Sequence, residues 1–176
     1  CELRPMQATL VPERREELTT EGGLNLSLAE TRHSVDEAVT RLSEAGIRVS
    51  LFVDPTEESL RRSKDLGVEA VELHTGEYAN ARGDAEHKRE LERVRTATET
   101  AHGLGLSVHA GHGLTYANVT PVAALPLIEE MNIGHSIVAR ALIVGLSGAV
   151  QEMRRLVLAA PSRVREPGRW IPPIGY

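Results

Sequence analysis

Two short turns carry the residue types that could do chemistry. Residues 108–115 predict a strand end that runs into His112, with Gly111 and Gly113 on either side. Residues 132–136 predict a second strand end that leads directly into a helix. Glycine lets the backbone approach a ligand closely or adopt a positive φ, and histidine exchanges protons near neutral pH. The pattern therefore predicts a site where both turns lie side by side at one rim of a sheet. The plainer alternative is a tight turn with an incidental histidine.

Other polar residues fall where neighbouring strands are expected to end. A strand over residues 68–74 places Glu72 and His74 on one face, because side chains alternate between the two faces of a strand. This face is either exposed to solvent or, in a sheet covered by helices, part of a shared interior. A carboxylate in such an interior is desolvated, which raises its pKa unless a cation pairs with it. The candidates at strand ends are Asp54, Glu72, His74, His112 and His135, with His109 lower in its strand.

The second turn also has the pattern of an anion site. Gly134 and His135 stand at the start of an expected helix, where backbone N–H groups and the helix dipole favour a phosphate. In barrel enzymes a short extra helix after the last strand often serves this purpose. The alternative is an ordinary helix start capped by Ser136.

The composition is that of an ordinary globular protein. Hydrophobic residues make up 41% and charged residues 26% of the 176 residues, which allows one domain with a core. The net charge of −5 argues against nucleic-acid binding, and no apolar run reaches the ~18 residues of a membrane span. Cys1 is the single cysteine, so an internal disulfide is impossible and a reducing, cytoplasmic location is expected. The chain does not begin with Met, which indicates processing or a longer polypeptide.

The hydrophobic periodicity predicts strands and helices in alternation. Strands are expected over residues 6–11, 48–53, 68–74 and 106–110, and a fifth ends at Asn132–Ile133. Helices are expected over 35–45, from a cap at Asp54 to near Gly67, from a cap at Asp84 to Gly103 or Gly105, from Thr120 to Glu130, and over 136–142 and 147–158. Residues 12–31 show no clear period and predict a long loop, which is either functional or a mobile surface segment.

This alternation predicts an α/β fold with a parallel sheet and right-handed crossovers. No Gly-x-Gly-x-x-Gly follows the first strand, so a dinucleotide-binding fold has little support. A (β/α)8 TIM barrel fits better, but a full barrel needs eight strands and roughly 250 residues. We therefore expect about the last five β/α units of a barrel. The expected domain covers residues 1–160, and residues 161–176, with Trp170 and several prolines, form an irregular C-terminal tail.

Taken together, these motifs resemble the pyridoxine 5′-phosphate synthase family of vitamin B6 biosynthesis. The resemblance covers roughly residues 6–158 and is carried by the stretches 9–23, 49–54, 71–76, 110–116 and 132–137. It implies a ring-closing synthase that condenses 3-amino-2-oxopropyl phosphate with 1-deoxy-D-xylulose 5-phosphate. The implied products are pyridoxine 5′-phosphate, phosphate and water. It also implies that no metal or organic cofactor is needed, and that the barrels assemble as a homo-octamer.

The resemblance also implies roles for individual residues. His112 matches the family's proton donor, and Glu72 matches the glutamate that stabilises the transition state. The matching substrate contacts are Thr19, on a loop that closes over the site, and Gly113, Gly134 and His135. The family's first three strands, which carry another catalytic histidine and glutamate, have no counterpart here. We therefore expect this chain alone to be inactive, or the sequence to be incomplete.

Two other functions remain open from the sequence. The first is a metal-dependent TIM-barrel hydrolase with ligands drawn from Asp54, His74, His109, His112 and His135. The second is a non-catalytic fragment that binds phosphate compounds. Neither nucleic acid nor a membrane is expected as a partner.

Overall fold

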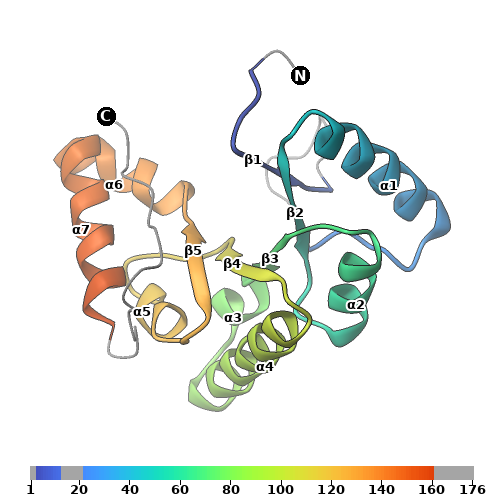
Figure 1. Ribbon diagram of the computed structural model, residues 1–176. Helices are drawn as coiled ribbons and strands as arrows, with labels where there is room; N and C mark the ends of the chain where they lie inside the picture. Colours follow the sequence, from blue (N-terminus) through green and yellow to red (C-terminus); the bar gives the residue numbers. More distant parts are fainter. Residues whose placement is uncertain (1–2, 13–21, 161–176) are drawn as a thin grey trace.

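The computed structural model describes residues 3–12 and 22–160, in which twelve helices and strands follow one another along the chain (Figure 1). The strands are β1 (Gln7–Leu10), β2 (Arg48–Val53), β3 (Ala70–His74), β4 (Ser107–Gly111) and β5 (Ile128–Asn132). The helices are α1 (Ala29–Glu44), α2 (Glu57–Asp65), α3 (Gly76–Asn80), α4 (Asp84–Gly103), α5 (Val119–Ala123), α6 (His135–Val144) and α7 (Leu146–Ala159).

The strands form one sheet in the order β1-β2-β3-β4-β5, and every neighbouring pair is parallel. Helices connect successive strands, with α1 and α2 packed on β2 and α4 packed on β3 and β4 (Figure 1). The predicted α/β class with a parallel sheet is therefore confirmed. All five carboxyl ends point the same way, so residues that follow the strands gather at one rim.

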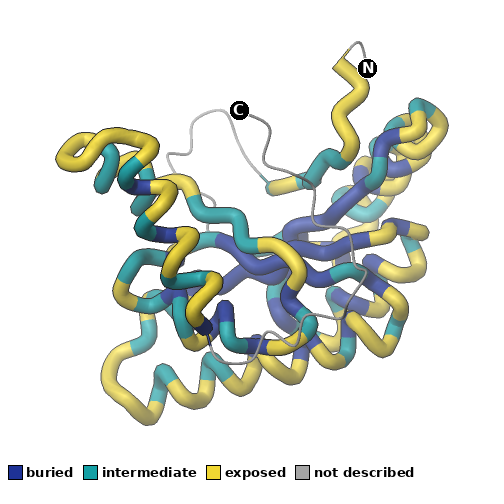
Figure 2. The backbone as a smooth tube through the Cα atoms, turned by 60° about the vertical axis from the view of Figure 1, so that its left-hand side comes forward, coloured by how far each residue is buried: buried dark blue, intermediate teal, exposed yellow. Residues whose placement is uncertain are grey.

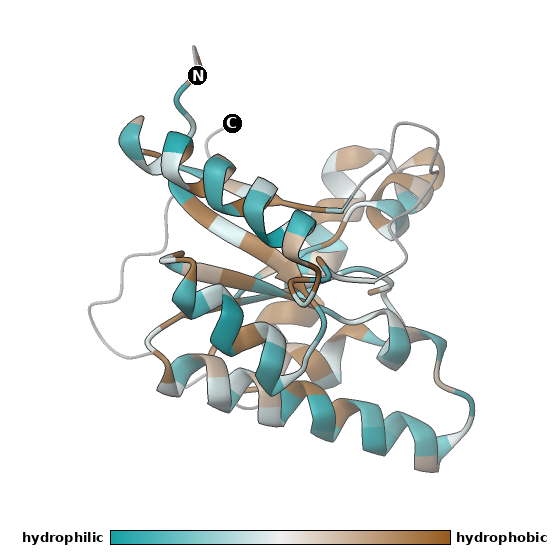
Figure 3. Cartoon of the chain, turned by 90° about the vertical axis from the view of Figure 1, so that its right-hand side faces the viewer, coloured by the Kyte–Doolittle hydropathy of each residue, from teal (hydrophilic) through white to brown (hydrophobic). Residues whose placement is uncertain are grey.

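One face of the sheet builds the apolar core. Its alternate side chains are completely buried, and they are Val49, Leu51, Val53, Val71, Leu73, Val108 and Ala110. The strands form the buried centre of the molecule in Figure 2, while the outer turns of the helices are exposed. Hydropathy follows the same division in Figure 3, where the outward sides of α1 and α4 are mostly hydrophilic. With few aromatic residues available, branched aliphatic side chains fill this core.

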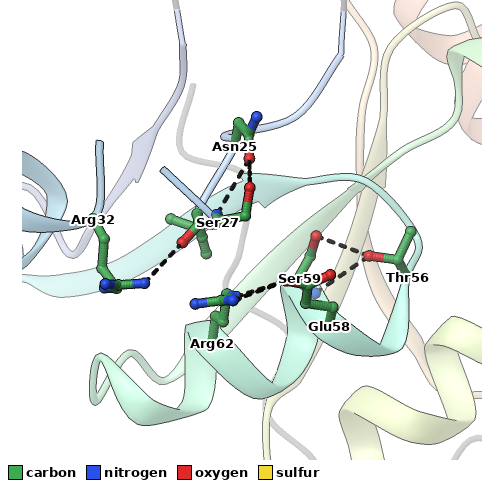
Figure 4. Close-up of polar contacts among 8 residues, drawn as sticks. Asn25, Ser27, Arg32, Thr56, Glu58, Ser59 and Arg62 are labelled. Carbon is green, nitrogen blue, oxygen red and sulfur yellow. Dashed lines mark hydrogen bonds and ion pairs between the residues drawn. The ribbon is translucent and has the colours of Figure 1, made fainter. Parts of the chain in front are cut away.

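The helix after β2 begins later than the sequence predicts. Asp54 was expected to cap it, but the cap is Thr56, whose hydroxyl oxygen accepts a hydrogen bond of 3.2 Å from the Ser59 amide (Figure 4). Asp54 is held by tertiary contacts instead. The first-turn residue Glu58 also pairs with Arg62 at 2.9 Å, which adds a small i,i+4 contribution. The local sequence around Asp54 does not show that its carboxylate has a distant partner.

Three further expectations were wrong. Asp84 does not cap α4, because it is the first residue of the helix and Gly83 is the N-cap. The helix expected from Thr120 to Glu130 ends at Ala123, and residues 128–132 form β5. Pro126 explains this end, since it lacks an N–H and disfavours helical backbone in the residue before it.

In addition, α1 begins inside the expected loop of residues 12–31, and α3 was not predicted.

The last two helices form a pair beside β5. The Arg140 guanidinium on α6 lies 2.8 Å from a carboxylate oxygen of Glu152 on α7. Helix α6 has no buried residue, and the side chains of Leu142 and Ile143 are 87% and 78% exposed. This helix therefore presents an apolar surface without a partner in the described part of the chain. Among the described helices, none has the length and apolar character needed to cross a membrane.

The burial pattern predicts unequal effects for two leucines. Leu73 is completely buried on β3, so Leu73→Ala should lower the free energy of unfolding by about 2–5 kcal/mol. Leu142 is 87% exposed, so Leu142→Ala should change it by less than about 0.5 kcal/mol. Urea unfolding followed by circular dichroism measures both. Equal losses in the two variants would show that the core is assigned to the wrong face.

Candidate active site

The second face of the sheet carries polar side chains, yet it is also buried. Glu72 and His74 are each 8% exposed, and His109 is 2% exposed. The Nε2 atom of Gln7 on β1 lies 3.5 Å from Nδ1 of His109 on β4, although β2 and β3 separate the two strands. Neighbouring strands are ~4.8 Å apart, so this contact requires a strongly curved sheet. The polar face is therefore the concave side of the sheet.

Glu72 lies in the middle of this concave face. Its Oε2 atom accepts a hydrogen bond of 2.7 Å from Nδ2 of Asn132 on β5. The Oε1 atom occupies space next to Gly111, where a Cβ atom would lie only 2.2 Å away. Burial raises the pKa of Glu72, the Asn132 hydrogen bond opposes this rise, and the charge of Glu130 adds to it. The sequence-based expectation of an interior carboxylate is thus met in the fold.

The turn after β4 holds His112 in an unusual backbone conformation. His112 has a φ of 78°, in the left-handed region that residues other than glycine rarely adopt. Thr75 stabilises the turn, because its hydroxyl lies 2.8 Å from the Gly111 carbonyl oxygen and 2.6 Å from the His112 carbonyl oxygen. The Thr75 amide also donates to the Gly111 carbonyl oxygen at 2.9 Å. Such strain persists only where the surroundings fix it, and it concentrates at functional sites.

The His112 ring belongs to a cluster of three rings. Its centroid lies 5.1 Å from that of His74 and 6.0 Å from that of Phe52. Burial lowers the pKa of His112, and the like charges of His74 and His135 lower it further. His112 is therefore neutral near neutral pH and is able to accept a proton before it donates one.

Asp54 and His74 form a pair at the end of β2 and β3. Oδ1 of Asp54 lies 3.1 Å from Nδ1 of His74 and accepts a 2.9 Å hydrogen bond from the Gly23 amide. The hydrogen bond with His74 is the main cause of the lowered pKa of Asp54, and burial opposes it. The segment that begins at Gly22 is thereby connected to the rim of the sheet.

The second predicted turn lies beside the first. Gly134 is the N-cap of α6, and no side chain caps this helix. Ser136 was the alternative cap, but its hydroxyl donates to the Leu114 carbonyl oxygen at 3.0 Å and so connects the two turns. The expected side-by-side arrangement is confirmed. His135 is exposed, and its charge acts on His112.

The remaining predicted contacts are placed as follows. Gly113 is exposed with a φ of 75°, and a Cβ atom there would lie 2.6 Å from Cβ of Ala79. Both its backbone conformation and its surroundings therefore favour glycine. Thr19 lies outside the described residues. The structure thus brings His112, Gly113, Gly134 and His135 to the same rim, places the Glu72 carboxylate on the concave face next to Gly111, and leaves Thr19 unplaced.

Comparison with known proteins identifies the family. Residues 1–159 match the family described as "Pyridoxal phosphate biosynthesis protein PdxJ". The chain belongs to the PdxJ family.

Three curated relatives of this PdxJ chain carry the same name. Proteins named pyridoxine 5′-phosphate synthase from Trichlorobacter lovleyi, Magnetococcus marinus and Coxiella burnetii are 54%, 53% and 48% identical over 159, 157 and 159 residues. These matches cover 89%, 89% and 90% of the chain. They cover 65%, 64% and 65% of the relatives, so the chain spans less than two thirds of their length.

Two residues of the site were not singled out by sequence analysis of the PdxJ chain. Thr75 fixes the His112 turn, and Asn132 binds the Glu72 carboxylate. A signal for Asn132 existed, since it stands at the end of a strand within the second motif. Its partner became clear only from the register, in which Asn132 lies opposite Gly111 and Glu72 lies opposite His109.

The hydrolase alternative lacks a ligand set in the described ranges of the PdxJ chain. Within residues 3–12 and 22–160, no group of three or more histidine, cysteine, aspartate or glutamate residues is arranged to hold a metal ion. His74 is directed at Asp54, while His109 contacts Gln7. His109 therefore has its side-chain partner outside the proposed ligand set.

Burial of Glu72 predicts a pH-dependent cost in stability. Because the pKa of Glu72 is raised, the folded chain binds a proton at this carboxyl more readily than the unfolded chain does. The stability that the protonated carboxyl contributes is therefore lost as the pH rises through the raised pKa. Glu72→Gln keeps the shape and stays neutral. We expect Glu72→Gln to be more stable than the unsubstituted chain at about pH 8, with the difference shrinking toward about pH 4.

Urea unfolding at a series of pH values measures this difference. Glu99→Gln, at an exposed position of α4, is the matched control and should show no such gain. If Glu72→Gln gains nothing at the higher pH, the ionised carboxylate is not penalised by burial.

Proposed function

We propose that this chain forms part of a pyridoxine 5′-phosphate synthase. The proposed reaction condenses 3-amino-2-oxopropyl phosphate with 1-deoxy-D-xylulose 5-phosphate to give pyridoxine 5′-phosphate, phosphate and water, in vitamin B6 biosynthesis. The observation that carries the proposal is the match to the PdxJ family over residues 1–159. The buried carboxylate of Glu72 and the neutral ring of His112 at one rim support it, since this chemistry requires both groups.

The proposed chemistry consists mainly of proton transfers. An amine condenses with a ketone to form an imine with loss of water, and ring closure then requires proton transfers and the loss of phosphate and water. We assign His112 as the proton donor in these steps, which it can serve after taking up a proton from an earlier step. We assign Glu72 to the stabilisation of positive charge on the nitrogen-containing intermediates. The Asn132 hydrogen bond favours the ionised form that this role needs.

Both proposed substrates carry a phosphate group, which needs an anion site. We assign Gly113, Gly134 and His135 as contacts to the aminoketone phosphate. The start of α6 supports this, because its first backbone N–H groups have no side-chain cap and favour an anion. Thr19 remains a proposed contact to the deoxyxylulose phosphate. No resident metal or organic cofactor is part of the proposal.

We further propose that the five strands belong to a (β/α)8 barrel. The contact between Gln7 and His109 supports this, since the sheet curves enough for β1 and β4 side chains to meet across its concave face. The proposed domain is residues 1–160, followed by a tail at 161–176 outside the described residues. The apolar surface at Leu142 and Ile143 is consistent with burial against further structure, and a homo-octamer in the cytoplasm remains our expectation.

A product assay tests the proposed activity. The 176-residue chain is incubated with both phosphorylated substrates, alone and fused to the part of the Trichlorobacter lovleyi relative that has no counterpart in it. We expect pyridoxine 5′-phosphate, detected by mass spectrometry, from the fusion but not from the chain alone. His112→Gln in the fusion should lower the rate by about 10²- to 10⁴-fold.

Three results would contradict parts of this proposal. Turnover by the chain alone would show that the site is complete without further strands. Substrate binding by a folded fusion that forms no product would support a non-catalytic phosphate-binding protein. Undiminished product formation by His112→Gln would remove His112 from the proposed role.

The proposed phosphate site makes a separate prediction at Gly134. A Cβ atom at this position meets nothing within 4 Å, so a side chain is tolerated sterically. Gly134→Asp should therefore weaken binding of 3-amino-2-oxopropyl phosphate at least tenfold through charge repulsion, while Gly134→Asn, of the same size, should bind far better. Isothermal titration calorimetry measures both. Equal affinities would place the phosphate elsewhere.

A further inference from the structure

Asp54 contacts two parts of the chain that are distant in sequence. Its Oδ1 atom accepts from the Gly23 amide at 2.9 Å and lies 3.1 Å from Nδ1 of the His74 ring. Gly23 packs so closely against β2 that a Cβ atom there would lie 2.3 Å from the Asp54 amide nitrogen. The amide of Leu24 also donates to the Phe52 carbonyl oxygen at 2.8 Å. The backbone at residues 23–24 is therefore fixed directly beside the carboxylate.

The His74 ring is confined on several sides. Its side chain is 9% exposed, against 45% for Asp54. The Phe52 ring lies edge-on with the centroids 5.3 Å apart. Next to Nε2 lies Gly76, where a Cβ atom would come within 2.3 Å of that nitrogen. An ionised aspartate only accepts hydrogen bonds, so Nδ1 carries a proton in this pair and neutral His74 has a bare Nε2.

The confined ring is also the closest aromatic neighbour of His112. The His74 and His112 centroids are 5.1 Å apart, a shorter distance than either ring has to Phe52. Because His74 is the ring nearest to His112, a change in the position of the His74 ring changes the packing around the His112 ring.

We propose that Asp54 and His74 are positioning residues for His112, and that they couple the placement of the backbone at Gly23 to the His112 ring. The proposal deepens the proposed function, on which its catalytic meaning rests. Asp54 holds the Nδ1 side of His74, and His74 in turn holds His112. Neither residue needs to touch a substrate for this role.

Charged groups face the cluster from several elements. His74 on β3 and His135 on α6 act on His112, and both lower its pKa. Asp54 is influenced by His74 and by Arg93 of α4, and both lower its pKa. Replacing His74 with glutamine thus removes one of the two histidines whose charge lowers the pKa of His112. Replacing Asp54 chiefly changes which nitrogen of His74 carries the proton.

Histidine-ring nitrogen NMR on the intact 176-residue chain tests these statements. In the unsubstituted chain, neutral His74 should carry its proton on Nδ1. Asp54→Ala should move the proton to Nε2, while Asp54→Asn, which keeps an acceptor oxygen, should retain it on Nδ1. His74→Gln should raise the midpoint of the His112 titration, because the charge of His74 lowers the pKa of His112.

An exposed histidine outside the cluster serves as the control. His102→Gln, at an exposed position near the end of α4, should leave both signals unchanged. Circular dichroism confirms that each variant is folded. If Asp54→Ala leaves the His74 tautomer unchanged, the Asp54 contact does not position the ring. If His74→Gln leaves the His112 midpoint unchanged, the two rings are not coupled.

Activity adds an independent reading in the fusion used for the product assay. Asp54→Ala should lower kcat about 10- to 100-fold with a smaller change in KM, and Asp54→Asn should recover most of it. The NMR results do not depend on turnover. A negative NMR result with an active fusion therefore overturns the positioning role alone, whereas a positive NMR result with an inactive fusion overturns the proposed function alone.

Discussion

The register of three parallel strands is the constraint on which the site depends. Glu72 pairs with His109, His74 pairs with Gly111, and Gly111 pairs with Asn132 in the next strand. The absent side chain of Gly111 leaves the room that the Glu72 carboxylate fills. From the far side of that space, Asn132 reaches across to bind the same carboxylate. A shift of one residue in either strand pair would point these groups at the apolar helices.

The two faces of the sheet have opposite energetic roles. The apolar face buries branched aliphatic side chains completely and supplies most of the favourable free energy of folding. The concave face holds a desolvated carboxylate at Glu72 and a strained backbone at His112, both of which oppose folding. Such a division is typical of active sites, where groups are held in states that stability alone would not select. The hydrogen bonds of Thr75 and Asn132 offset part of this unfavourable free energy.

The elements with strong hydrophobic periodicity were predicted correctly from the sequence. The predictions were wrong where tertiary contacts determine an element boundary or the role of a residue. The parallel α/β arrangement and the convergence of the two turns follow from alternation and from the placement of glycines, and both were predicted. The helical pattern of residues 120–130 extends past the end of α5 at Ala123, because Pro126 disfavours helical backbone in the residue before it. Asp54 was misassigned as a helix cap, because its competing partner, His74, lies 20 residues away and becomes adjacent only in the sheet. The capping rule is local and does not include such a partner.

The proposed phosphate contact and the proposed proton donor are electrostatically linked through their positions. His135 is the first residue of α6, and the next residue, Ser136, donates a hydrogen bond to Leu114 near the His112 turn. The charge of His135 lowers the pKa of His112. A phosphate dianion at the start of α6 would offset that positive charge and favour the protonated form of His112. His112 would then be neutral in the free site and would gain a proton more readily once the phosphate is bound. The position of the proposed anion site beside the histidine would therefore order the proposed steps. Phosphate binding would precede the protonation that the proposed ring closure requires.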